Sequence, residues 1–158
     1  MNICFVCLGN IVRSPLAENM FRYVAEKKGV GDKYQVDSAG TSAYHVGEAP
    51  DSRMRKVARE RGLTYSGSAR QFQKEDFARF DLVVAMDKEN RRALERLAGS
   101  PREENKIRLM REFDPQAQPD AGVPDPYYGG MEGFHRVFDI VERSTRELLE
   151  ALERGEEV

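Results

Sequence analysis

The chain has 158 residues, of which 40% are apolar and 33% are charged, and its formal net charge is −2. This length and composition are typical of one globular domain with a core of its own. There is no basic excess to favour nucleic acid, no apolar run long enough to span a membrane, and no signal-peptide pattern at the N-terminus. We therefore expect a cytoplasmic protein, and its two cysteines are too few for a disulfide framework.

The first predicted elements are a short buried strand over residues 2–6 and a helix that follows it. Ser14 is a good N-cap residue, and Pro15 suits the first helical position. Gly29 can end the helix. The apolar residues that recur at helical spacing are Leu16, Met20 and Val24.

A second strand is predicted over residues 34–38, followed by a loop over 40–50. Asp51 can cap a helix that runs to about Gly62. The residues of this helix expected to face the core are Met54, Val57 and Ala58.

The second half of the chain continues the alternation of strands and helices. "DLVVAM", residues 81–86, is the clearest buried strand, and residues 88–98 are predicted to be helical. A fourth strand is predicted over 106–110 and a long loop over 111–130; a loop of that length is usually functional. The last helix, about 131–154, has an apolar side formed by Phe134, Val137, Phe138, Val141, Leu148 and Leu152.

Strands that alternate with helices predict a doubly wound α/β fold with a mostly parallel sheet. Such sheets bind ligands beyond the carboxyl ends of their strands, at a topological switch point. The loop after the first strand, Cys7 to Arg13, is therefore the main candidate for a binding site.

This loop has the residues of an anion-binding loop that contains a thiol. Gly9 and Asn10 tolerate unusual backbone angles, so successive N–H groups can turn inward. The following helix adds its positive end, and Arg13 offers a planar fork that matches phosphate. These groups favour the thiolate form of Cys7, which is the nucleophilic form.

Each cysteine also has a plainer interpretation. Cys7 could be a buried structural residue beside a glycine turn, and Cys4 in mid-strand is expected to pack in the core. A redox pair is disfavoured because strand residues three apart point to opposite faces. A zinc site would need further ligands, and only His45 and His135 are available.

Attack of a thiolate on phosphorus needs an acid to protonate the leaving oxygen. "PDPYYGG", residues 124–130, holds Asp125 between two prolines. Tyr127 and Tyr128 follow and could form a wall for a flat substrate. A surface turn is the alternative, since Pro, Asp and Gly are turn residues, and Asp120 is a second carboxylate nearby.

With these motifs in place, the chain resembles the low molecular weight protein tyrosine phosphatases nearly end to end. The stretches that carry the resemblance are "FVCLGNIVRSPLAE", "DSAGTSAYHVGEAPDSR", "ARQFQKEDFARFDLVVAMDKEN" and "PDPYYGG". We expect a single three-layer domain over residues 1–158, with a four-stranded parallel sheet in the flavodoxin-like order 2-1-3-4.

The resemblance implies a role for each site residue. Cys7 is the implied nucleophile, which forms a phosphocysteine, and Arg13 is implied to bind the phosphoryl oxygens. Ser14 is implied to stabilise the thiolate through its hydroxyl. Asp125 is implied to act first as the general acid and then as the general base. The implied phosphate-binding loop comprises Leu8, Gly9, Asn10, Ile11, Val12 and Arg13.

Further implied roles concern loop support and substrate binding. Asn10 is expected to hold the loop through a hydrogen bond that reaches Ser38. The implied substrate-binding residues are Ile11, Tyr44, Tyr127 and Tyr128. No metal or cofactor is implied. The implied substrates are proteins that carry phosphotyrosine, and the implied active-site ligands are phosphate, sulfate or vanadate. The expected oligomeric state is a monomer or weak dimer.

Two positions depart from the family pattern. Many members have a second cysteine where this chain has Val12. That cysteine can form a disulfide with the nucleophile and protect it from irreversible oxidation. Many members also have a histidine where this chain has Gly67, which puts one supporting hydrogen bond in doubt.

Other function classes share the loop. Arsenate reductases use further cysteines downstream, and none follows Cys7 here. Protein arginine phosphatases typically have threonine in place of Ile11, so Ile11 and the paired tyrosines favour an aromatic substrate. A phosphotyrosine-binding module without activity would lose Cys7 or Asp125, and both are present. A small redox or binding protein is the remaining alternative.

Overall fold

The computed structural model describes residues 1–158 and contains one four-stranded parallel sheet. Its strand order, β2-β1-β3-β4, confirms the predicted order 2-1-3-4. The strands are β1 (Asn2–Cys7), β2 (Gln35–Gly40), β3 (Leu82–Ala85) and β4 (Ile107–Leu109). β1 pairs with both β2 and β3, so the chain order switches direction there and a crevice opens at the carboxyl end of β1.

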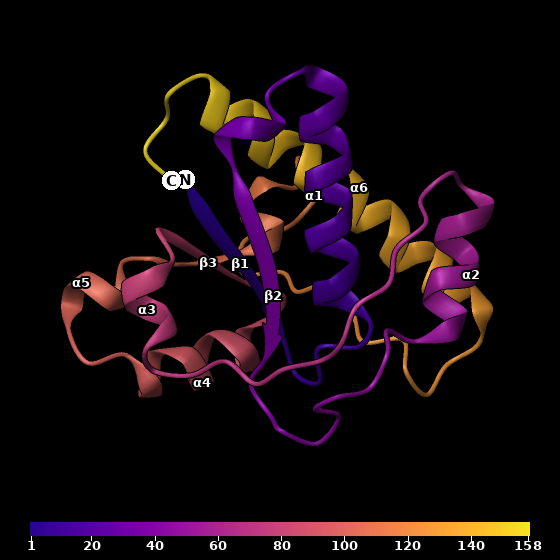
Figure 1. Ribbon diagram of the computed structural model, residues 1–158, viewed down its shortest axis with the longest axis horizontal. Coiled ribbons are helices and arrows are strands. Elements are labelled where there is room, and N and C mark those ends of the chain that lie inside the picture. The colour runs from indigo at the N-terminus through magenta and orange to yellow at the C-terminus, as the bar shows by residue number, and fades with distance from the viewer.

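The helices lie on both faces of the sheet. Figure 1 shows α1, α2 and α6 on one side, and α3, α4 and α5 on the other. The bounds are α1 (Arg13–Lys28), α2 (Ser52–Glu60), α3 (Asp76–Arg79), α4 (Lys88–Leu97), α5 (Pro101–Glu104) and α6 (Met131–Glu153). Two short 3-10 turns complete the structure: η1 (Gly31–Lys33) and η2 (Met110–Phe113).

The alternation of side chains along β1 divides the core into two layers. Phe5 and Cys7 belong to the larger apolar cluster, which includes residues of α1, α2 and α6. Cys4 and Val6 belong to the smaller cluster on the other face, with Leu94 of α4. The two cysteines therefore point to opposite faces of the sheet, as the strand periodicity predicts.

Most predicted helix boundaries are confirmed. Gly29 ends α1 in the left-handed conformation, with a φ of 81°. Asp51 caps α2 by accepting hydrogen bonds from the N–H groups of Arg53 and Met54. None of the helices combines the length and the apolar composition that crossing a bilayer requires.

The prediction for the start of α1 was wrong. The helix begins at Arg13, the N-cap position is Val12, and no side chain caps it. Ser14 lies inside the helix because its hydroxyl has other partners in the loop before it. The four-residue helices α3 and α5 were not predicted, because segments so short show no helical periodicity.

Candidate active site

The loop between β1 and α1 is held in one shape by Asn10. This residue has a φ of 56°, in the left-handed region that asparagine tolerates better than most residues. Its side-chain amide donates to the hydroxyls of Ser14, at 2.9 Å, and Ser38, at 3.0 Å. Its side-chain oxygen accepts from the N–H of Arg70 at 2.9 Å. The expected bond from Asn10 to Ser38 is therefore present.

The backbone of the loop keeps hydrogen-bond donors free. The N–H groups of Gly9, Ile11 and Val12 donate to no carbonyl of the protein. Nearly all buried N–H groups in proteins are paired, so a run of unpaired ones is typical of a nest for an anion. The adjoining end of α1 contributes the positive end of its dipole to the same place.

The sulfur of Cys7 has two hydrogen-bond partners, Asn10 and Ser14. The N–H of Asn10 donates to it at 3.3 Å, and the hydroxyl oxygen of Ser14 is 3.1 Å away. That hydroxyl already accepts from Asn10, and its single proton can go either to the sulfur or to the carbonyl of Ala39 at 3.3 Å. A negatively charged sulfur is the stronger acceptor, so Ser14 is placed to stabilise a thiolate.

Arg13 is buried, yet it is surrounded by acceptors. Its guanidinium donates to Asp87 at 2.6 Å and to the carbonyl of Val123 at 2.9 Å, and Asp125 lies 3.6 Å away. Burial acts to lower the pKa of Arg13, but the neighbouring Cys7, Asp87 and Asp125 raise it above its usual value. Arg13 is therefore a fixed positive charge beside the sulfur.

Asp125 reaches the site from the long loop before α6. Its carboxylate accepts from the N–H of Tyr127 at 3.1 Å and is partly exposed, at 45% of the side chain. The loop is fastened upstream, where Val123 donates to the carbonyl of Met86 at 2.8 Å. Asp120 points elsewhere, toward Lys88 and Arg91. The structure thus brings Asp125, and not Asp120, to the cysteine loop.

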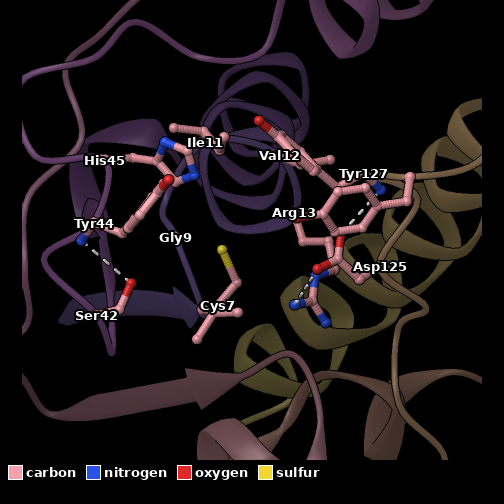
Figure 2. A pocket seen from close by; sticks show the side chains of 12 residues that line it. Cys7, Gly9, Ile11, Val12, Arg13, Ser42, Tyr44, His45, Asp125 and Tyr127 are labelled. Atoms are coloured by element: carbon pink, nitrogen blue, oxygen red, sulfur yellow. Dashed lines mark hydrogen bonds and ion pairs between the residues drawn. The ribbon is translucent and has the colours of Figure 1, made fainter.

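A cavity of about 400 Å³ opens above Cys7, a volume that suits a small ligand. Figure 2 shows the sulfur on its floor, with Arg13 and Asp125 to one side and Tyr44 and His45 to the other. The lining residues are Cys7, Leu8, Gly9, Ile11, Val12, Arg13, Ser42, Tyr44, His45, Asp125, Tyr127 and Tyr128. All the substrate-binding residues implied by the resemblance line it.

An aromatic rim, formed by Tyr44, His45, Tyr127 and Tyr128, surrounds the opening. The His45 ring contacts Tyr44 edge-on at 4.7 Å between centroids and Tyr127 at 5.9 Å, and Tyr127 contacts Tyr128 at 5.0 Å. His45 also bonds Glu48 through Nδ1 at 2.8 Å. Such a rim can hold a flat substrate by ring contacts.

Sequence reasoning missed three residues of the site. His45 entered only as a possible metal ligand, Ser42 was not singled out, and Asp87 fell between a predicted strand and a predicted helix without a role. No local pattern marks them, because each acts through a contact that the fold creates. No group of three or more His, Cys, Asp or Glu side chains in the chain is placed to hold a metal ion.

The fold and the site together define a class of protein: a doubly wound α/β protein with a thiol in a loop of free N–H groups at the carboxyl edge of its sheet. Comparison with known proteins gives the family. The family model described as low molecular weight phosphotyrosine protein phosphatase matches residues 2–158. The chain belongs to this family and is a hydrolase of the protein phosphatase class.

Individual relatives agree over nearly the whole chain. A low molecular weight protein-tyrosine-phosphatase of Streptomyces coelicolor is 48% identical over 95% of this chain and 92% of its own. A protein tyrosine phosphatase of Entamoeba histolytica, solved with Hepes in its active site, is 43% identical with a TM-score of 0.93, covering 98% of both chains. A Drosophila arginine phosphatase is 31% identical with a TM-score of 0.89, over 97% of this chain and 98% of its own.

Proposed function

We propose that this chain hydrolyses phosphotyrosine in proteins, and small aryl phosphates, through a phosphocysteine intermediate on Cys7. The observation that carries the proposal is the position of the Cys7 sulfur, which receives the Asn10 N–H at 3.3 Å and lies 3.1 Å from the Ser14 hydroxyl. Arg13 and the free N–H groups of the loop surround the place that a phosphoryl group would occupy.

The reaction has two steps. The Cys7 thiolate attacks phosphorus, an S–P bond forms, and the bond from phosphorus to the tyrosyl oxygen breaks. Protonated Asp125 gives its proton to that oxygen. Water then attacks the phosphocysteine and passes a proton to the Asp125 carboxylate, the S–P bond breaks, and phosphate leaves with the thiolate restored. Arg13 and the loop amides stabilise the charge on the phosphoryl oxygens throughout.

An aromatic substrate is favoured over phosphoarginine. Ile11 lines the cavity with an apolar side chain, and the aromatic rim stands above it. The Drosophila arginine phosphatase shares the fold, so the fold alone does not distinguish the two substrates. The Hepes in the active site of the Entamoeba enzyme is a sulfonate, an anion similar in shape to phosphate.

The experiment is hydrolysis of p-nitrophenyl phosphate at mildly acid pH in EDTA, with and without vanadate, by the wild type and Cys7→Ser. We expect the wild type to show metal-independent activity that vanadate inhibits. The Cys7→Ser variant should have no activity but should still bind phosphate. Peptides with phosphotyrosine and phosphoarginine are then compared. Inactivity of the folded wild type would overturn the proposal, and preference for phosphoarginine would overturn the substrate assignment.

Three properties of the whole protein belong to the same proposal. We infer a single domain over residues 1–158, a monomer or weak dimer, and a cytoplasmic location. Both cysteines are unpaired, which fits a reducing compartment. Light scattering in solution tests the oligomeric state. Limited proteolysis tests whether the chain forms a single domain, and cell fractionation tests the cytoplasmic location.

A further inference from the structure

A second cavity, of about 380 Å³, lies on α2 beside the active site. Four of its six lining residues are cationic: Arg53, Arg55, Lys56 and Arg59. Charge is concentrated here although the whole chain has a net charge of −2. A concave surface of this kind attracts and holds an anionic group.

Three of these cations have no partner of opposite charge. No Asp or Glu oxygen lies within 4.0 Å of Arg55, Lys56 or Arg59, and we call these three residues the basic face of α2. Arg55 is held in place by a hydrogen bond from Nε to the carbonyl of Pro50 at 3.0 Å. The nearby Asp51 is already paired with Arg53 at 2.8 Å.

Arg53 connects the two cavities. Its guanidinium donates to the carbonyl of Tyr127 at 3.0 Å and lies 5.2 Å from the centre of the Tyr127 ring. Tyr127 lines the active-site cavity, and Arg53 lines the second one. A chain that leaves the active site across Tyr127 therefore arrives at the basic face.

The second cavity is also fixed relative to the cysteine loop. The N–H of Asp51, the cap of α2, donates to the carbonyl of Ile11 at 2.8 Å. Figure 1 shows α2 packed beside α6, which supplies Met131 to the cavity. An anion held on α2 would thus lie at a constant separation from a phosphoryl group held by the loop.

We propose that the basic face of α2 binds acidic residues that flank the phosphotyrosine of a protein substrate. This inference rests on the proposed function and adds a preference for acidic sequences to it. The position beside the aromatic rim, the concave shape and the three unpaired cations favour a carboxylate-bearing stretch of the substrate chain over a flat anionic surface.

The test compares two phosphotyrosine peptides, one flanked by Asp and Glu and one by Asn and Gln at the same positions. The variant is Arg55→Gln, Lys56→Gln, Arg59→Gln. The matched control is the triple variant Arg92→Gln, Arg96→Gln, Arg102→Gln, which changes the net charge by the same amount. These three residues are exposed cations of α4 and α5 without ion-pair partners. Circular dichroism verifies that each variant is folded.

We expect the wild type and the control to favour the acidic peptide by about 3- to 10-fold in kcat/KM, mainly through KM, the range that a few exposed ion pairs provide. The α2 variant should treat both peptides alike. Raising the ionic strength until the Debye length is about 3 Å should remove the preference of the wild type.

Two results would overturn the inference: no preference in the wild type, or a preference that the α2 variant retains. p-Nitrophenyl phosphate, which has no flanking residues, separates this failure from that of the proposed function. If the wild type hydrolyses it but shows no preference among peptides, only the inference is wrong. If the wild type hydrolyses neither it nor the peptides, the proposed function is wrong and the inference falls with it.

Discussion

The hydroxyl oxygen of Ser14 lies 3.1 Å from the sulfur of Cys7, seven residues away along the chain. Ser14→Ala removes this donor from a sulfur that otherwise receives only the N–H of Asn10. Because hydrogen bonds to charged groups contribute about 1.5–3 kcal/mol, we expect alkylation of Cys7 by iodoacetamide at mildly acid pH to slow about tenfold or more. Mass spectrometry measures the rate. An unchanged rate in the folded variant would mean that the hydroxyl gives its proton to Ala39 instead.

Asp125→Asn tests the acid, and Asp120→Asn serves as its control. Loss of a general acid slows turnover by about 10²–10⁴-fold, and the loss should grow as the leaving group becomes more basic. The assay is kcat for a series of aryl phosphates. Asp120 points toward Lys88 and Arg91, so its variant should behave as the wild type. A uniform loss across the series for Asp125→Asn would argue against proton donation.

Gly40 faces the cysteine loop so closely that no side chain fits. A Cβ there would lie 2.8 Å from the carbonyl oxygen of Leu8 and 3.1 Å from the nitrogen of Asn10, both backbone atoms. Gly40→Ala must displace the loop, and displacements of about 1 Å can cost about 10²-fold in rate. We expect that loss in kcat/KM for p-nitrophenyl phosphate. Gly130→Ala, with open space at its Cβ, is the control and should keep full activity.

Asp114 fastens the start of the loop that carries Asp125. Burial acts to raise the pKa of Asp114, but hydrogen bonds from Arg143, the N–H of Gln116 and Arg111 lower it below its usual value. A carboxylate with a lowered pKa stabilises the fold above the unfolded pKa, and this contribution is lost as pH falls through the folded pKa. Asp114→Asn should therefore lower the free energy of unfolding by about 3 kcal/mol at neutral pH, and by less in strong acid.

Urea unfolding of the wild type and of Asp114→Asn, across the acid range, measures the difference between their free energies of unfolding. Asp139→Asn is the comparison, because the exposed pair of Asp139 with Arg61 is expected to contribute less than about 1 kcal/mol. A difference between Asp114→Asn and the wild type that stays constant with pH would show that the carboxylate charge is not the source of the stability.

After inactivation by hydrogen peroxide, this enzyme should recover less activity in dithiothreitol than a relative that has a second cysteine in the loop. Val12, which the family resemblance places where many members have a second cysteine, is buried, and Cys4 lies on the opposite face of the sheet from Cys7. Residues three apart on a strand are about 10 Å apart, beyond the reach of a disulfide. Burial also raises the pKa of Cys4 well above its usual value, so its thiol is unreactive. Full recovery with dithiothreitol together with a Cys4–Cys7 link in mass spectrometry would contradict this.

The sequence by itself determined the class of fold and the position of the cysteine loop between the first strand and the first helix. Buried strands such as 82–85 are continuous apolar runs, and the larger helices repeat apolar residues every three or four positions, so local patterns suffice for them. The loop from Cys7 to Arg13 is also local: a strand, a turn and a helix follow one another without a gap.

Only the tertiary structure decided which distant residues complete the site. Asn10 joins Ser38 and Arg70, Asp87 orients Arg13 across 74 positions, and Asp125 rather than Asp120 reaches the cysteine loop. Ser14, read as a helix cap from its neighbours in sequence, bonds the sulfur and Asn10 instead. Such contacts depend on how the strands pair and where the loops are fastened, and the order of residues along the chain contains no local record of them.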